Sequence, residues 1–196
     1  MDRYEYARRH GIKDQAVKID DKKKNDALAR EAEQLVARFL GVKWTEKRVD
    51  GGVDLAYRGW KIDVKWSGAV PFRPDRKTRF AFAGLKVPAW KPMKGALIYV
   101  AVHGAIVSDH TLGIEPTDED VMKIYGWAFR RELRDAPVLD FGYKTYEGEP
   151  ATMHVLDLAS LHSREMLKAI PAFDPERDID DVLAEAAAAL TPGWAY

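Results

Sequence analysis

The chain of 196 residues contains no cysteine, which excludes disulfides and thiolate metal sites. It has no apolar run approaching the roughly 20 residues that a membrane span needs. Residues 1–10 are polar and carry no signal-peptide core, so we expect a cytoplasmic protein without a membrane partner. P-loop, GxSxG, HExxH and CxxC motifs are also absent. Their absence removes the usual kinase, serine hydrolase, zincin and redox interpretations.

Length and composition indicate one domain. Hydrophobic residues make up 46% of the chain, and a domain of this size buries roughly 70% of the surface that its unfolded chain exposes. We therefore predict a single domain over residues 1–196. Residues 1–24 are predicted to be a polar extension, residues 26–103 the core, and residues 172–196 a C-terminal helix and tail.

The net charge of zero conceals an uneven distribution of charge. Residues 1–94 contain 23 Lys and Arg against 13 Asp and Glu, whereas residues 95–196 contain 8 against 18. Residues 61–94 are the most basic stretch, with nine basic and two acidic side chains. A phosphate backbone is one partner that suits such a field. The other explanation is that the two halves attract each other within the fold.

Two short segments with alternating polarity predict a β-hairpin. Apolar and polar residues alternate over residues 53–57 and again over residues 60–66, which is the period of half-buried strands. Arg58-Gly59 between them is a two-residue turn, and such a turn fixes the register. Asp54 is then expected to face Asp63, and Lys65 to lie on the same side of its strand as Asp63.

This arrangement predicts a cation site. Two facing carboxylates destabilise a sheet and raise the pKa of one of them, unless a cation neutralises the pair. A divalent metal ion would remove that cost. Lys65 adds an ammonium group beside the two acids, so two acids and one base are expected to converge on one patch.

The first predicted helix lies upstream of this hairpin. Residues 26–40 show a helical apolar pattern, with Asn25 as the expected N-cap and Gly41 at the end. In this pattern Glu31 falls at the edge of the buried stripe, and Glu33 projects further toward solvent. The structural role open to Glu31 is a salt bridge at the edge of this stripe.

Further elements follow from the same kind of pattern. We predict strands at residues 42–49, 96–102, 124–129, 141–143 and 153–156, and a helical turn at residues 118–123. Helices are predicted at residues 130–134, at residues 161–170 with Ser160 as the cap, and at residues 179–190. The strand at 96–102 should lie beside the strand that carries Asp63. The last helix should dock on the core or on a second subunit, which would make a homodimer. His154 and His162 are expected to be structural.

The pattern D-x8-D-x-K on adjacent strands, after a helix that carries an acid, resembles the PD-(D/E)XK nuclease superfamily. Val53 stands where that motif has its proline. The resemblance implies a restriction-endonuclease-like αβββαβ core, which is an α/β fold with a mixed sheet flanked by helices. Extra C-terminal strands and helices would complete the chain.

The resemblance also implies roles for individual residues. Asp54, Asp63 and the backbone carbonyl of Val64 would hold Mg²⁺, with Mn²⁺ as a substitute, and Glu31 would complete the site. Lys65 would orient or deprotonate the attacking water. Oxygen ligands of this kind select Mg²⁺ or Mn²⁺ over zinc.

Basic and aromatic residues interleave between residues 67 and 94, which suits contact with a nucleic acid backbone and bases. The candidate DNA contacts are Arg73, Arg76, Lys77 and Arg79. The sequence therefore predicts a Mg²⁺-dependent deoxyribonuclease. One alternative is a catalytically silent nucleic-acid-binding module of the same fold. The other is an unrelated α/β protein in which Asp63 and Lys65 form an ordinary surface pair.

Overall fold

The computed structural model describes residues 19–45, 52–67, 84–93, 95–103, 122–144, 148 and 150–191. The helices are α2 (Ile19–Leu40), α3 (Arg130–Asp135), α4 (Arg164–Ala169) and α5 (Ile179–Ala188), with a 3-10 turn at Leu158–Ser160. The strands are β1 (Leu55–Tyr57), β2 (Trp60–Ser67), β3 (Gly84–Pro88), β4 (Ile98–His103), β5 (Lys123–Phe129), β6 (Val138–Lys144) and β7 (Pro150–Asp157).

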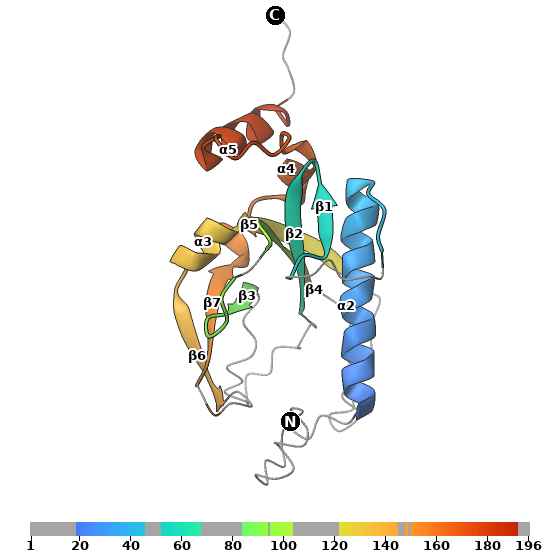
Figure 1. The fold of residues 1–196 in the computed structure, drawn as a ribbon, viewed down its shortest axis with the longest axis vertical. Helices are drawn as coiled ribbons and strands as arrows, with labels where there is room; N and C mark the ends of the chain where they lie inside the picture. The colour runs from blue at the N-terminus through green and yellow to red at the C-terminus, as the bar shows by residue number, and fades with distance from the viewer. Residues whose placement is uncertain are drawn as a thin grey trace, which may run out of the picture.

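The strands form two sheets (Figure 1). The main sheet has the order β1-β2-β4-β5, in which β2 and β4 are parallel and the other two pairs are antiparallel. The second sheet has the order β3-β7-β6 and is antiparallel. A mixed sheet with flanking helices is thus confirmed. The second sheet was not predicted, because β3 falls inside the stretch interpreted as a loop.

The main sheet lies between α2 and the second sheet (Figure 1). Alternation along β2 and β4 gives each face of the main sheet its own core. Ile62, Val64, Ile98 and Val100 pack with Val36 of α2. Tyr99 and Ala101, on the other face, pack with Leu85 and Val87 of β3. Because the middle of β2 is covered on both sides, a polar side chain there that points toward the second sheet is withdrawn from water.

Helix α2 ends as predicted, at Leu40. Gly41 has a positive φ of 69°, its N–H donates to Arg38 O, and the Val42 N–H donates to Ala37 O at 3.0 Å. This is a Schellman closure, which favours glycine. The predicted start was wrong, because α2 begins at Ile19 rather than at residue 26. Residues 19–25 lack apolar periodicity, yet their acids suit the first turn of a helix and lysine has a high helix propensity.

The strand predicted at residues 42–49 is absent from residues 42–45, and the rest of it lies outside the described residues. The Trp44 indole N–H donates to Glu33 Oε2 at 3.0 Å, which holds this segment against α2. The helical turn predicted at residues 118–123 lies mostly outside the described residues, and Lys123 begins β5. The αβββαβ order is therefore not confirmed.

The later predictions are confirmed with shifted bounds. Strands β4 and β5 and helix α3 lie where predicted, β6 and β7 are longer, and α5 ends at Ala188. Helix α4 begins at Arg164, capped by Ser163 rather than Ser160. His162 forms two backbone hydrogen bonds with Trp127, at 3.0 and 2.9 Å. These bonds hold His162 in an extended conformation, so the helix begins only after it. None of the described helices is both long enough and apolar enough to cross a membrane.

Candidate functional site

The predicted hairpin register is confirmed. Leu55 pairs with Ile62 and Tyr57 pairs with Trp60. Arg58 and Gly59 have φ values of 49° and 86°, as a type I′ hairpin turn requires. Backbone contacts hold Arg58 in this conformation, since its guanidinium donates to Ile170 O at 2.7 Å and its carbonyl accepts from Phe173 N–H at 2.8 Å.

The paired register ends at Leu55 and Ile62, and Asp54 lies one residue before β1. The Asp54 N–H donates to Ile62 O at 2.8 Å, and the Val64 N–H donates to Asp54 Oδ2 at 2.7 Å. The Asp54 carboxylate is thus fixed over the middle of β2. Besides burial, the charge of Asp54 and a hydrogen bond between the Asp54 and Asp63 side chains raise the pKa of Asp63. The two side chains therefore share one site.

Among the described residues, Asp63 is the one charged residue that is buried, with 7% of its surface exposed. It points to the second-sheet face, and its neighbour on β4 is the buried Tyr99. Burial is the main cause that raises the pKa of Asp63 from 3.8 to about 7. Lys65 lowers the pKa of Asp63 by its charge and hydrogen bond, and Asp54 raises it further. A metal-free Asp63 is therefore partly protonated at neutral pH.

Lys65 is the cation of the site. Its Nζ lies 2.6 Å from Asp63 Oδ1, and 34% of the lysine side chain is exposed. The ammonium also lies 5.9 Å from the centre of the Tyr99 ring. The Lys65 ammonium therefore contacts the buried carboxylate, while about a third of the lysine side chain stays exposed.

Tyr99 is a neighbour of the site that the sequence interpretation missed. Burial, with the Asp63 charge second, raises the pKa of Tyr99 to about 12, against an opposing effect of Arg130. Its hydroxyl therefore stays neutral. Tyr99 is the one aromatic residue in the apolar run at residues 96–102, and the parallel pairing of β2 with β4 places it beside Asp63.

Val64 contributes backbone to the site. Its side chain packs on the opposite face, with the α2 core. Because Ile62 O and the Val64 N–H both point toward Asp54 of the neighbouring segment, strand geometry directs the Val64 carbonyl to the same side. This carbonyl can join the two carboxylates as an oxygen ligand.

The structure does not bring Glu31 to the carboxylate pair. Glu31 is exposed and Glu33 is half-buried, which reverses the predicted order. The buried stripe of α2 is centred on Ala32, Val36 and Leu40 and is rotated toward Glu33. Within the described part of the chain, no three His, Cys, Asp or Glu side chains group together as a metal site. The predicted role of Glu31 therefore has no geometric support.

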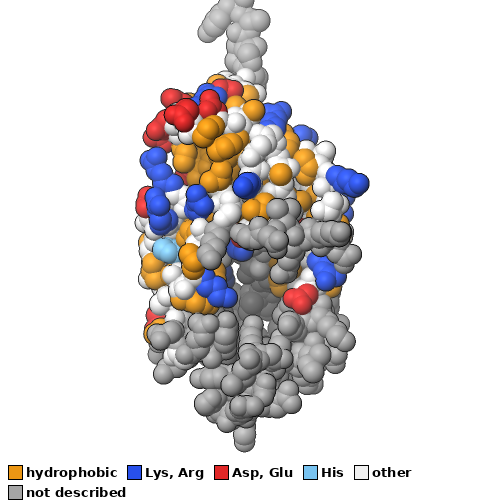
Figure 2. Space-filling view, viewed as in Figure 1, with side chains coloured by type: hydrophobic (Ala, Val, Ile, Leu, Met, Phe, Trp, Pro, Cys, Tyr) orange, Lys and Arg blue, Asp and Glu red, His pale blue; other side chains and the backbone are white. Residues whose placement is uncertain are grey.

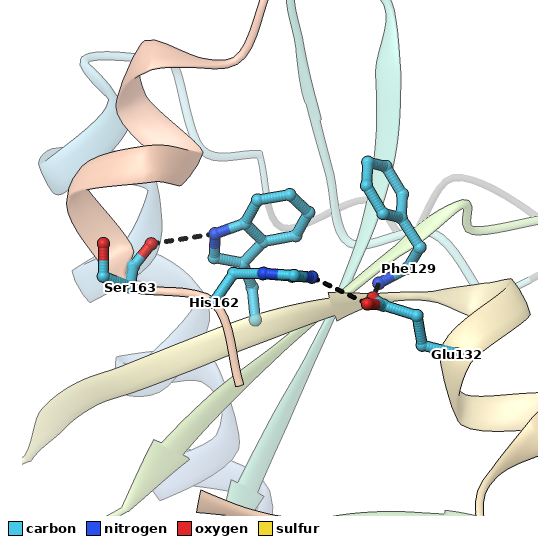
Figure 3. A network of polar contacts seen from close by, with 5 residues as sticks. Phe129, Glu132, His162 and Ser163 are labelled. Carbon is cyan, nitrogen blue, oxygen red and sulfur yellow. Dashed lines mark hydrogen bonds and ion pairs between the residues drawn. The ribbon is translucent and has the colours of Figure 1, made fainter. Parts of the chain in front are cut away.

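The predicted DNA contacts Arg73, Arg76, Lys77 and Arg79 lie outside the described residues. A second polar cluster, built on β5 and α3, is described and is structural (Figure 3). His162 Nε2 lies 2.7 Å from Glu132 Oε1, and Glu132 Oε2 accepts from the Phe129 N–H at 2.7 Å. The Trp127 indole donates to Ser163 O at 2.9 Å. These bonds attach residues 162–163 to β5.

The same bonds account for the charge state of Glu132. Burial would raise the pKa of Glu132, but its hydrogen bonds to His162 and to the Phe129 N–H hold it below the ordinary value. Gly126 completes the attachment, since a Cβ there would lie 2.6 Å from His162 O. Every group in this cluster has a partner within the fold, so the Asp54, Asp63 and Lys65 cluster is the candidate site.

Comparisons with family models, with curated proteins and with solved structures find no match to this chain.

Proposed function

We propose that this protein is a metal-dependent deoxyribonuclease that hydrolyses phosphodiester bonds. One observation carries the proposal: a buried carboxylate, Asp63, lies beside a second carboxylate and 2.6 Å from the ammonium of Lys65. A buried carboxylate beside a second carboxylate lowers stability and is a typical mark of a functional site. The resemblance of D-x8-D-x-K to the PD-(D/E)XK superfamily supports the same activity, and so does the hairpin followed by a parallel strand.

The residues fit a divalent cation. Asp63 and Asp54 present carboxylate oxygens, and the Val64 carbonyl is directed to the same side. Oxygen ligands of this kind suit Mg²⁺ or Mn²⁺. Burial raises the pKa of Asp63 most, and repulsion from Asp54 raises it further; a bound cation would relieve that repulsion. When bound, such an ion polarises a phosphate and lowers the pKa of water.

The chain's own groups would then act around the phosphate. Lys65 has N–H bonds left after contacting Asp63 Oδ1 and is partly exposed, so it can orient a water molecule and offset negative charge that grows on the phosphate. Asp63 holds Lys65 in place. Tyr99 keeps a neutral ring against both groups and excludes solvent from the second-sheet side.

DNA is the proposed substrate because the most basic stretch, residues 61–94, includes Asp63 and Lys65. Positive charge of this density attracts a phosphate backbone irrespective of base sequence. We propose double-stranded or branched DNA, rather than RNA, as the substrate.

Cleavage assays test the function directly. Supercoiled plasmid, linear duplex, branched DNA and single strands would be incubated with the protein in Mg²⁺, in Mn²⁺ or in EDTA. We expect metal-dependent cleavage by the wild-type protein and none by Asp63→Asn prepared in the same way. Cleavage that persists in EDTA, or at equal rate in Asp63→Asn, would show a contaminating or different activity. No cleavage of any substrate would overturn the proposal.

A second candidate function is a nucleic-acid-binding module without catalysis. The ion pair between Asp63 and Lys65 favours it, because it partly neutralises the buried charge without a metal. DNA binding in EDTA together with no cleavage in either metal would select this alternative.

Charge reversal in the basic segment should weaken DNA binding generally. Changing Arg73, Arg76 and Arg79 to Glu removes cations that are expected to contact phosphates, and each phosphate contact contributes about 0.9 to the slope of log affinity against log salt. We therefore expect weaker binding to all DNA sequences and a shallower slope, measured by fluorescence anisotropy at several salt concentrations. An unchanged slope would remove this segment from the DNA contact surface.

A further inference from the structure

A pocket of about 310 Å³ opens where the main sheet meets the C-terminal segment. Its apolar wall comes from Trp60 at the start of β2, Leu97 before β4, Phe129 at the end of β5, and Phe173. The rings pack on one another: Trp60 lies 5.4 Å from Phe129 and 4.8 Å from Phe173, measured between ring centres. Of these rings, Phe173 is the accessible one, with 38% of its surface exposed.

Four arginines line the same pocket: Arg130, Arg131, Arg134 and Arg177. Arg177 is paired with Glu185. Arg134 and Asp135 lie 4.0 Å apart, at the outer limit of an ion pair, and both side chains are about 70% exposed. This pair therefore contributes little to stability. Arg130 and Arg131 form no ion pair with another described residue. Three guanidinium groups are therefore available to an anion, and a guanidinium fork matches phosphate geometry.

One acidic residue, Asp174, lines the pocket, and both it and Asp178 of the same segment accept hydrogen bonds from backbone N–H groups. Asp174 Oδ1 accepts from the Glu176 N–H at 3.0 Å, and Asp178 Oδ1 caps α5 by accepting from the Asp180 N–H at 2.8 Å. Figure 2 shows the resulting separation, with hydrophobic side chains between α3 and α5, basic side chains over α3 and acidic side chains over α5. The pocket thus offers an apolar surface with positive charge on one side.

The pocket is close to the carboxylate site along the sheet. Trp60 precedes Asp63 by three residues on β2, which is roughly 10 Å along a strand. Leu97 stands two residues before Tyr99, the ring that adjoins Asp63 and Lys65. A ligand in the pocket and a phosphate at the carboxylate site could therefore belong to one strand.

We propose that this pocket binds one nucleotide unit, with its phosphate on Arg130, Arg131 and Arg134 and its base against Phe173. An aromatic ring beside free guanidinium groups is the combination that binds a base and a phosphate together. The choice of a nucleotide over other aromatic anions rests on the proposed nuclease function. The unit is either a free nucleotide or one nucleotide of a strand, and both offer the same chemistry to the pocket.

Calorimetric titration in EDTA tests this inference without any cleavage. We expect thymidine 5′-monophosphate to bind more tightly than inorganic phosphate or thymidine, because only the nucleotide contacts both walls. The double variant Arg131→Gln, Arg134→Gln should weaken nucleotide binding about tenfold or more, as loss of charge-assisted hydrogen bonds does. Phe173→Leu keeps an apolar side chain but should weaken binding of the nucleotide and leave that of inorganic phosphate unchanged.

Arg164→Gln is the matched control, because Arg164 is an exposed arginine on α4, paired with Glu165 and outside the pocket. It should leave binding unchanged. Circular dichroism and thermal unfolding of each variant separate lost contacts from lost fold. Short single strands with and without a 5′-phosphate distinguish the source: affinity that depends on that phosphate and falls in the double variant indicates a strand end, whereas binding of free nucleotides alone indicates a nucleotide effector.

Two results would overturn the inference. One is no nucleotide binding by the wild-type protein at millimolar concentration, and the other is equal binding in both pocket variants. If the protein cleaves DNA but binds no nucleotide in EDTA, the pocket inference alone fails. If nucleotides bind but neither metal supports cleavage, the proposed nuclease activity alone fails.

Discussion

Asp63→Asn is expected to remove a pH-dependent loss of stability from the metal-free protein while abolishing cleavage. The pKa of Asp63 is about 7 in the folded protein, against an ordinary value of 3.8. Between these values the folded protein keeps a proton that the unfolded chain has released. Stability therefore falls as pH rises from about 4 to about 7 and stays low above that range.

The size of this effect is large for one side chain. Each pH unit between the two pKa values contributes about 1.4 kcal/mol, so the loss of stability is on the order of 4 kcal/mol. An asparagine side chain does not ionise and escapes this loss. The variant should then be no less stable than the wild type at pH 8, and its relative stability should increase between pH 5 and pH 8.

Urea unfolding in EDTA at several pH values measures this difference. Asp135→Asn is the matched control, because Asp135 is 69% exposed and should behave as the wild type does. Added Mg²⁺ should restore stability to the wild-type protein at pH 8 and not to Asp63→Asn. An identical pH dependence in wild type and Asp63→Asn would mean that Asp63 is not held in the buried, like-charged site described above.

Lys65→Ala is expected to reduce cleavage by about two to three orders of magnitude, the usual cost of losing one preorganised charge or donor at a reacting group. The ammonium lies 2.6 Å from Asp63 Oδ1, and the lysine side chain is partly exposed. Removing a cation cannot weaken a neighbouring cation site by charge. Binding of Mg²⁺ should therefore persist, provided that it is measured at a pH where Asp63 is ionised.

The measurement is calorimetric Mg²⁺ titration at pH 8.5 beside plasmid cleavage on the same preparations. That pH is needed because Lys65 lowers the pKa of Asp63, so its removal raises this pKa further. Lys61→Ala is the matched control: Lys61 is an exposed lysine on the same strand, two residues to the other side of Asp63. Full activity in Lys65→Ala, or an equal loss in Lys61→Ala, would remove Lys65 from the catalytic machinery.

The sequence by itself determined the hairpin and much of its chemistry. Alternating polarity on both sides of Arg58-Gly59 fixes the pairing of Leu55 with Ile62. The shared side of Asp63 and Lys65 follows from strand geometry alone. The approach of Asp54 to Asp63 depends on its side chain, which accepts from the Val64 N–H. Gly41 likewise marked the end of α2. These features depend on neighbours within a few residues, and local patterns describe such neighbours well.

The tertiary structure decided how buried these residues are and which charges lie beside them. Asp63 is buried because β3, more than 20 residues further along the chain, packs over its face of the main sheet, and no periodicity in the hairpin encodes that cover. The rotation of α2 that exposes Glu31 and half-buries Glu33 depends on which residues of the sheet it meets. The arginine pocket joins the starts of β2 and β4 to Phe173. Burial and charge proximity are set by such distant contacts, whereas the sequence pattern reports only which side of its own element a residue occupies.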